Sequence, residues 1–159
     1  MTKNQCLLLV TCVLSVYGVG QVWLVQVSSY RLWAFVGRQE FHVYHLTWWH
    51  SIWGVVLAPA ILVFIGAVLM LWWRVAGIPD WSVWLGLGLQ AALLVGTAVW
   101  WGPLMARSEG PDGGILIERY HILMATHWLR VGIVTAYGIL VCWMLARSAF
   151  FGSAMTGSE

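Results

Sequence analysis

Four long apolar segments constrain this chain more than any other feature of its sequence. They run over about residues 6–27, 51–73, 81–101 and 122–146. Each reaches the roughly 20 residues that an α-helix needs to cross a hydrocarbon core about 30 Å thick. Helices are required because unpaired backbone groups cannot face lipid. The sequence therefore predicts an all-α integral membrane protein, with four transmembrane helices in an up-down bundle that forms one domain over residues 1–159.

The composition excludes the soluble and nucleic-acid-binding classes. Of the 159 residues, 61% are hydrophobic and only 9% are charged, whereas an ordinary soluble domain has about 25% charged residues. The thirteen tryptophans also fit a bilayer, because Trp collects where a membrane meets water. A net charge of +2 without a basic stripe gives no footprint for nucleic acid. We expect the lipid bilayer to be the main partner of the surface.

The connectors between the segments differ in length, which predicts their placement. Residues 28–40 and 102–118 form long connectors, while residues 74–80 form a short turn. With four spans, both long connectors fall on one face of the membrane, and the termini fall on the other. We expect the second and fourth helices to begin near residues 41 and 118, within these connectors. Lys and Arg are nearly balanced between the two faces, so the positive-inside rule leaves the orientation open.

All five histidines lie on the long-connector side, which is the most specific polar pattern of the chain. Three precede or enter the second span and two enter the fourth: His42, His45, His50, His121 and His127. The second and fourth spans run parallel, so depths along them can be compared. At about 1.5 Å of rise per residue, His50 lies deeper than His45, and His127 deeper than His121.

Helical rotation selects a subset of these side chains as candidate metal ligands. His42 and His45 share a face of the second helix, and Glu118 and His121, spaced i to i+3, share a face of the fourth. Imidazole and carboxylate together suit iron, copper or zinc. Di-iron bundles place ligands through two Glu-x-x-His motifs, but this chain has one, so a mononuclear or mixed site fits better. His50, His127 and Arg130 are candidates for a second layer.

Three other interpretations of the histidines stay open. Two histidines at equal depth on neighbouring helices can ligate haem b axially, and His45 with His121, or His50 with His127, meets that requirement. The side chains can equally be interfacial anchors that bind nothing. A pathway for protons or a small substrate is a third alternative.

Arg130 is a charge placed inside an apolar segment. Such a charge costs about 2.5 kcal/mol or more unless it is compensated. Either it faces the bundle, where Gln90 of the third span is a polar candidate partner, or it extends back to the interface by snorkelling.

Several stretches resemble known membrane proteins. The segments "EFHVYHLTWWHSI", "GIPDWSVWLGL", "GPLMARSE" and "THWLRVGIVTAYGILVCWML" resemble a set of small bacterial four-span membrane proteins of unassigned function. The "THWLR" motif is also loosely similar to the anthrone-oxygenase-like family of membrane proteins. The first resemblance implies a bacterial inner (cytoplasmic) membrane. The looser one implies an oxygen-using or oxidoreductase role, with His127 and Arg130 at the matching positions.

Three hypotheses about function follow from these patterns. The first is a membrane-embedded, metal- or haem-binding oxidoreductase that acts on a lipophilic small molecule or passes electrons; it assigns no catalytic residue. The second is a non-catalytic accessory subunit of a larger membrane complex, in which small residues and tryptophans serve protein and lipid contacts. The third is a small transporter, which a four-span chain would form only as a homo-oligomer.

Overall fold

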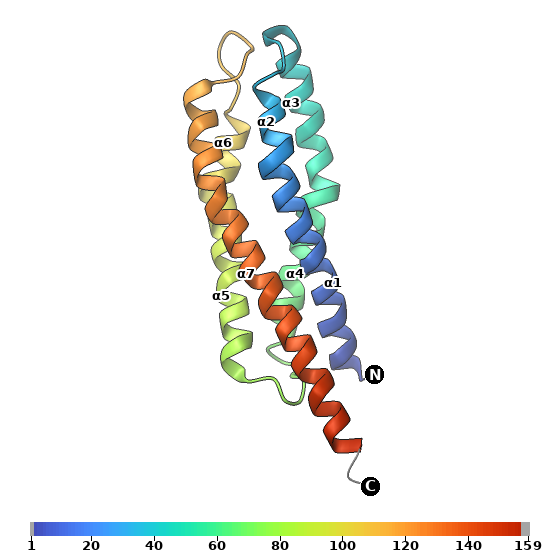
Figure 1. Ribbon diagram of the computed structural model, residues 1–159. Coiled ribbons are helices and arrows are strands. Elements are labelled where there is room, and N and C mark those ends of the chain that lie inside the picture. Colours follow the sequence, from blue (N-terminus) through green and yellow to red (C-terminus); the bar gives the residue numbers. More distant parts are fainter. Residues whose placement is uncertain (1, 157–159) are drawn as a thin grey trace.

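The chain folds into an elongated bundle of four helical spans. The computed structural model describes the backbone of residues 2–156 and the side chains of residues 2–149. Each span is long and apolar enough to cross a membrane; they cover Lys3–Trp33, Arg38–Leu69, Asp80–Ala106 and Ile117–Ala149. They alternate in direction, and the connections after the first and third spans lie at the end opposite the termini (Figure 1). The prediction of an all-α, four-span, up-down bundle is confirmed.

The first three spans are each built from two α-helical pieces joined by a π-helix. The first span contains α1 (Lys3–Leu24), η1 (Val25–Ser29) and α2 (Tyr30–Trp33). The second contains α3 (Arg38–Ile52), η2 (Trp53–Leu57) and α4 (Ala58–Leu69), and the third contains α5 (Asp80–Gly96), η3 (Thr97–Trp101) and α6 (Gly102–Ala106). The fourth span belongs to one continuous helix, α7 (Ile117–Thr156). The helices extend into the predicted long connectors, because residues 28–33 and 38–40 are helical. The first connection is therefore only residues 34–37, shorter than residues 70–79 between α4 and α5, which corrects the predicted order of lengths.

The order of the spans around the bundle follows their order in the sequence. The main contacts join α1 with α7, α1 with α4, α4 with α5, and α5 with α7. The second and fourth spans therefore lie diagonally across the bundle, with α7 crossing the face opposite α3 and α4 (Figure 1). The haem hypothesis pairs histidines of these two spans, and it remains a prediction from the sequence.

Close backbone approach fixes the pairing of α1 with α4. A Cβ atom added at Gly66 of α4 would overlap the side chain of Thr11 on α1, and both residues are buried. Small residues allow helices to approach closely where no hydrophobic effect drives them together. Around this contact lies an apolar core that includes Leu8, Val63 and Met144.

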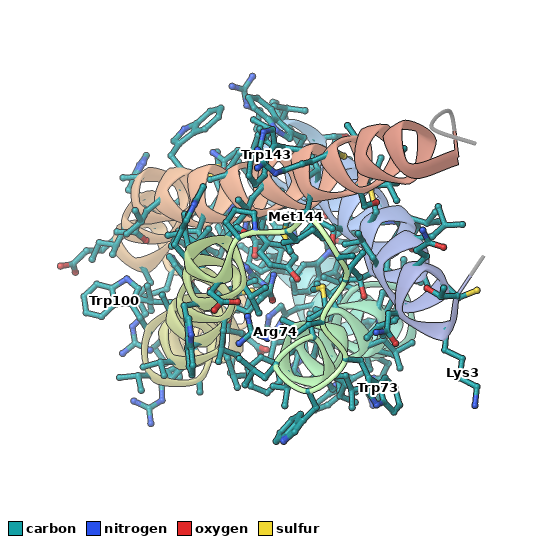
Figure 2. All side chains as sticks on the ribbon, turned by 90° about the horizontal axis from the view of Figure 1, so that it is seen from below. Lys3, Trp73, Arg74, Trp100, Trp143 and Met144 are labelled. Carbon is teal, nitrogen blue, oxygen red and sulfur yellow. The ribbon has the colours of Figure 1, made fainter. Side chains whose placement is uncertain are left out.

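Tryptophans cover the outside of the bundle. Trp73 and Trp100 lie about half exposed, and Figure 2 shows both on its outer surface, whereas Met144 points towards its middle. Exposed apolar side chains of this size suit contact with lipid. The Trp-rich character predicted from the sequence is thus present on this surface, and Trp33 and Trp101 are buried inside the bundle.

Polar contacts secure both ends of the bundle. At the end that holds the termini, Arg74 forms an ion pair with Asp80 at 2.5 Å, and the Asn4 side chain donates to the Arg74 carbonyl at 2.7 Å. At the opposite end, Arg38 at the start of α3 forms an ion pair at 3.3 Å with Asp112 of the connector between the third and fourth spans. These pairs lie near water, where such contacts contribute little stability, but they hold the connectors against the helix ends.

Candidate functional site

A cavity of about 110 Å³ lies inside the bundle, between all four spans. Most of its wall is apolar, with residues such as Val22, Trp49, Val63, Leu93 and Val134. A few polar side chains interrupt this wall: Gln21, Gln90, His127, Arg130 and Tyr137. Small-molecule sites typically have this combination of an apolar wall and few polar groups. An engineered apolar cavity of about 150 Å³ accepts benzene; this cavity is somewhat smaller and suits part of an alkyl chain.

The three π-helices all border this cavity. Val25 of η1, Val56 and Leu57 of η2, and Thr97 of η3 are among its lining residues. A π-helix carries one extra residue per turn, and such segments occur frequently at functional sites. Three irregular turns around one cavity therefore mark it as the candidate site of this chain.

Pro59 explains part of this irregularity and one edge of the cavity. Proline has no N–H, so it cannot bond the carbonyl four residues earlier, which belongs to Val55. The hydroxyl of Tyr17 on α1 donates to that carbonyl at 3.0 Å. Tyr17 is 42% exposed and also lines the cavity. The edge between α1 and η2 is thus a side of the cavity that reaches the lipid-facing surface.

His127 is the most precisely oriented polar group at the cavity. Its ring is 1% exposed, and its Nδ1 lies 2.7 Å from Oε1 of Gln26. The amide nitrogen of Gln26 donates to the Met124 carbonyl at 3.3 Å, which turns the amide oxygen towards the imidazole. Nδ1 must therefore carry the hydrogen, and Nε2 of the neutral ring keeps its lone pair. Within the described part of the chain, Nε2 has no hydrogen-bond partner.

Aromatic rings hold His127 from the connector side. The ring of Tyr30 packs edge-on against it with centroids 4.9 Å apart, and the Tyr30 hydroxyl donates to Sδ of Met105 at 2.8 Å. Both residues line the cavity. Since Tyr30 is itself buried, the imidazole has little freedom to rotate.

Arg130 lies one turn further along the same face of α7. It is 9% exposed and lines the cavity, so its side chain turns into the bundle and does not snorkel. Its guanidinium stacks over Trp101, 5.9 Å from the ring centroid. Among residues 2–149, Asp112 and Asp80 form ion pairs with Arg38 and Arg74, and Glu109 contacts His42. Arg130 therefore has no acidic partner in the part of the chain whose side chains are described.

Two further polar side chains that line the cavity have no hydrogen-bond partner among the described residues. Gln90 is buried and lines the cavity, yet it makes no hydrogen bond to Arg130 or to another described side chain. The hydroxyl of Tyr137 is buried without a hydrogen-bond partner. Buried polar groups are normally satisfied, so Gln90 and Tyr137 can each still form hydrogen bonds inside the cavity.

The structure separates the predicted metal ligands into two different environments. Nδ1 of His42 lies 2.9 Å from Oε1 of Glu109, in an exposed hydrogen-bond contact. His45 is buried, donates from Nε2 to the Met105 carbonyl at 3.0 Å, and stacks parallel to Phe41. His42 thus contacts the connector between the third and fourth spans, and His45 is enclosed by aromatic rings.

The remaining histidines and Glu118 lie on the surface of the bundle. Glu118 and His121 are exposed, and the nearest ring to His121 is that of Tyr120, with centroids 5.6 Å apart. His50 is exposed, and its Nδ1 donates to the Leu46 carbonyl at 2.7 Å. Over the described residues, no three His, Cys, Asp or Glu side chains form a group that could hold a metal ion. The set His42, His45, Glu118 and His121 remains a prediction from the sequence.

Three residues of the site are not predicted from the sequence: Gln26, Tyr30 and Tyr137. Gln26 sits at the end of an apolar run, and a lone buried amide in a span is a signal that could have pointed to it. The tyrosines give no comparable signal, because Tyr is common at membrane interfaces.

Comparison with protein-family models, curated proteins and solved structures finds no match to this chain.

Proposed function

We propose that this chain binds a lipophilic small molecule inside the bilayer, in the cavity between its four spans. The single observation that supports this best is the cavity itself, which is walled by apolar side chains and bordered by three π-helices. The lipid-facing edge at Tyr17 and Val55 gives such a molecule a route from the membrane without passing through water.

The test uses a photoreactive fatty alcohol with a diazirine in its chain. The protein is irradiated with this probe in lipid nanodiscs, and the labelled residues are located by peptide mass spectrometry. We expect labels on cavity-lining residues such as Val22 and Leu93 in addition to the outer surface. Excess unlabelled alcohol should reduce the labels in the cavity more than those outside.

Two glycines of α1 provide a matched pair of variants. Gly18 lines the cavity, and a Cβ added there would meet nothing within 4 Å. Gly20 is equally unobstructed but exposed and is not part of the cavity wall. Gly18→Leu should suppress labelling of the cavity, and Gly20→Leu should preserve it. Equal labelling in both variants would contradict the proposal.

A second candidate function, proton transfer, is favoured by the orientation of His127. Gln26 fixes Nδ1 as the donor, which leaves Nε2 as a base beside the cavity. A positioned histidine is the commonest general base. Proton removal accompanies many oxidations of C–H and O–H groups, so this role is compatible with the oxidoreductase hypothesis, for which the oxidant remains unassigned.

A lipophilic alkylating reagent tests this second candidate. We expect it to modify Nε2 of His127, because that nitrogen has no partner among the described residues, and the fatty alcohol should slow the reaction. His45 is an internal control, because its Nε2 is bonded and its ring does not line the cavity. Modification of His45 in preference to His127 would argue against a basic Nε2 at the cavity.

A further inference from the structure

We infer that the ligand of the cavity is a lipophilic organic acid whose carboxylate binds Arg130. This inference rests on the proposed function and adds the chemical class of the ligand. Its starting point is a guanidinium that is 91% buried, lies inside a membrane-spanning helix and faces the cavity. Arginine keeps its charge in proteins, so the surroundings must compensate it.

The depth of Arg130 makes compensation by water or lipid headgroups difficult. The fourth span covers Ile117–Ala149, so Arg130 lies three residues, or about 4.5 Å, from the middle of that span. Gln90 lies equally close to the middle of Asp80–Ala106. An arginine at the centre of a transmembrane helix costs about 2.5–3.5 kcal/mol on insertion scales. Arg130 and Gln90 therefore both lie near the middle of the membrane, and not at the interface with water.

The chain itself supplies no counter-ion in the described region. The five acidic residues of that region lie at or beyond the helix ends: Glu40, Asp80, Glu109, Asp112 and Glu118. Asp80, Glu109 and Asp112 already pair with other groups. The stacked Trp101 offers its ring face, which is worth about 2 kcal/mol to a desolvated cation. A buried cation that lacks an acidic partner within its own fold leaves that position to a ligand anion.

Arg130 and the cavity wall together favour a carboxylate with an apolar body. A guanidinium matches a carboxylate through two parallel hydrogen bonds. Gln90 and the Tyr137 hydroxyl are unpartnered donors elsewhere on the cavity wall, and Tyr137 lies seven residues, or about 10.5 Å of helical rise, from Arg130, so Arg130 is the group that binds the carboxylate. Most of the remaining wall is apolar, which favours a ligand with an apolar body.

The test compares two probes that differ only in the head group. A diazirine-bearing fatty acid and the fatty alcohol of the same chain are offered to the protein in nanodiscs at about pH 8.5, where a carboxyl group is ionised. We expect the acid to label the cavity at about tenfold lower concentration than the alcohol, since a hydrogen bond to a charged group contributes about 1.5–3 kcal/mol. This comparison needs no variant, so it holds even if a substitution prevents folding.

Variants assign the preference to Arg130. Arg130→Gln should reduce the ratio of acid to alcohol labelling to about one, and Arg130→Lys should keep part of the acid preference. Arg31→Gln is the matched control, because Arg31 is exposed on α2 and outside the cavity. Equal labelling of the wild-type cavity by both probes, or an acid preference that survives in Arg130→Gln, would overturn the inference and leave the binding function intact. Absence of cavity labelling by either probe would refute both.

Discussion

His127 and Gln26 lie 101 positions apart in the sequence, yet Nδ1 of the imidazole is 2.7 Å from the side-chain oxygen of the glutamine. This bond joins the fourth span to η1 of the first, at the level where the first span departs from α-helical geometry. It determines which ring nitrogen faces the cavity, and so it connects the irregular backbone of η1 with the chemistry available at the site.

The tautomers of two buried histidines should be opposite. His127 is expected to carry its hydrogen on Nδ1, bonded to Gln26, and His45 on Nε2, bonded to the Met105 carbonyl. NMR of protein with isotope-labelled histidines distinguishes the two forms. A hydrogen on Nε2 of His127 would mean that the Gln26 amide has the reverse orientation.

Gln26→Leu should destabilise the bundle by about 1 kcal/mol, in the range of hydrogen bonds between transmembrane helices. The substitution leaves Nδ1 of the buried His127 without its acceptor. Gln21→Leu provides a comparison, because Gln21 bonds the exposed Tyr17 hydroxyl at 2.9 Å and should cost less. Denaturation in mixed detergent micelles measures both, and equal costs would contradict the assigned role of Gln26.

Gly66→Ala should weaken the pairing of α1 with α4. Its new methyl group would overlap Thr11, and overpacking of this kind costs about 1–3 kcal/mol. At Gly88 of α5 a Cβ would meet nothing within 4 Å, so Gly88→Ala should preserve or slightly raise the thermal stability. The melting temperatures of the two variants test this contrast; a tolerant Gly66 would mean that α1 and α4 are further apart.

Mild oxidation should join Cys12 of α1 to Cys142 of α7. Their Sγ atoms lie 3.5 Å apart, although 130 positions separate them in the sequence. A membrane-permeable oxidant should remove two thiol hydrogens and leave Cys6, which is exposed near the N-terminus, as a free thiol. Peptide mass spectrometry reads the linkage, and crosslinks of Cys6 to either partner would conflict with this helix register.

Tyr17→Phe should affect the lipid-facing edge of the cavity more than the fold. The variant leaves the Val55 carbonyl, opposite Pro59, without the bond of 3.0 Å that now closes this edge. We expect faster labelling of the cavity by the fatty alcohol probe, with a stability loss of about 1 kcal/mol or less. Tyr120→Phe is the control, because no described hydrogen bond involves that hydroxyl; equal labelling rates in the two variants would exclude the edge as a route.

Length and hydropathy were sufficient to predict the number of spans and their alternation, because crossing a bilayer imposes both. The same information could not predict which spans become neighbours. The predicted metal site puts Glu118 and His121 opposite His42 and His45, as if the second and fourth spans were neighbours. Packing such as that of Gly66 on Thr11 instead puts these two spans diagonally across the bundle. Side-chain partners far apart in sequence, such as Gln26 and His127, depend on that order and so escaped prediction. Arg130 could be recognised from the sequence because a charged residue within an apolar segment is conspicuous whatever the order of the spans.

The mid-span position of Arg130 has an electrical consequence. Moving one elementary charge across the whole membrane changes its energy by about 2.3 kcal/mol for every 100 mV of membrane potential. An anion that reaches Arg130 from water would cross roughly half of that field, which corresponds to about 1.2 kcal/mol, or a roughly sevenfold change in occupancy. Occupancy of the cavity by an anion would therefore respond to the energised state of the membrane as well as to the amount of ligand.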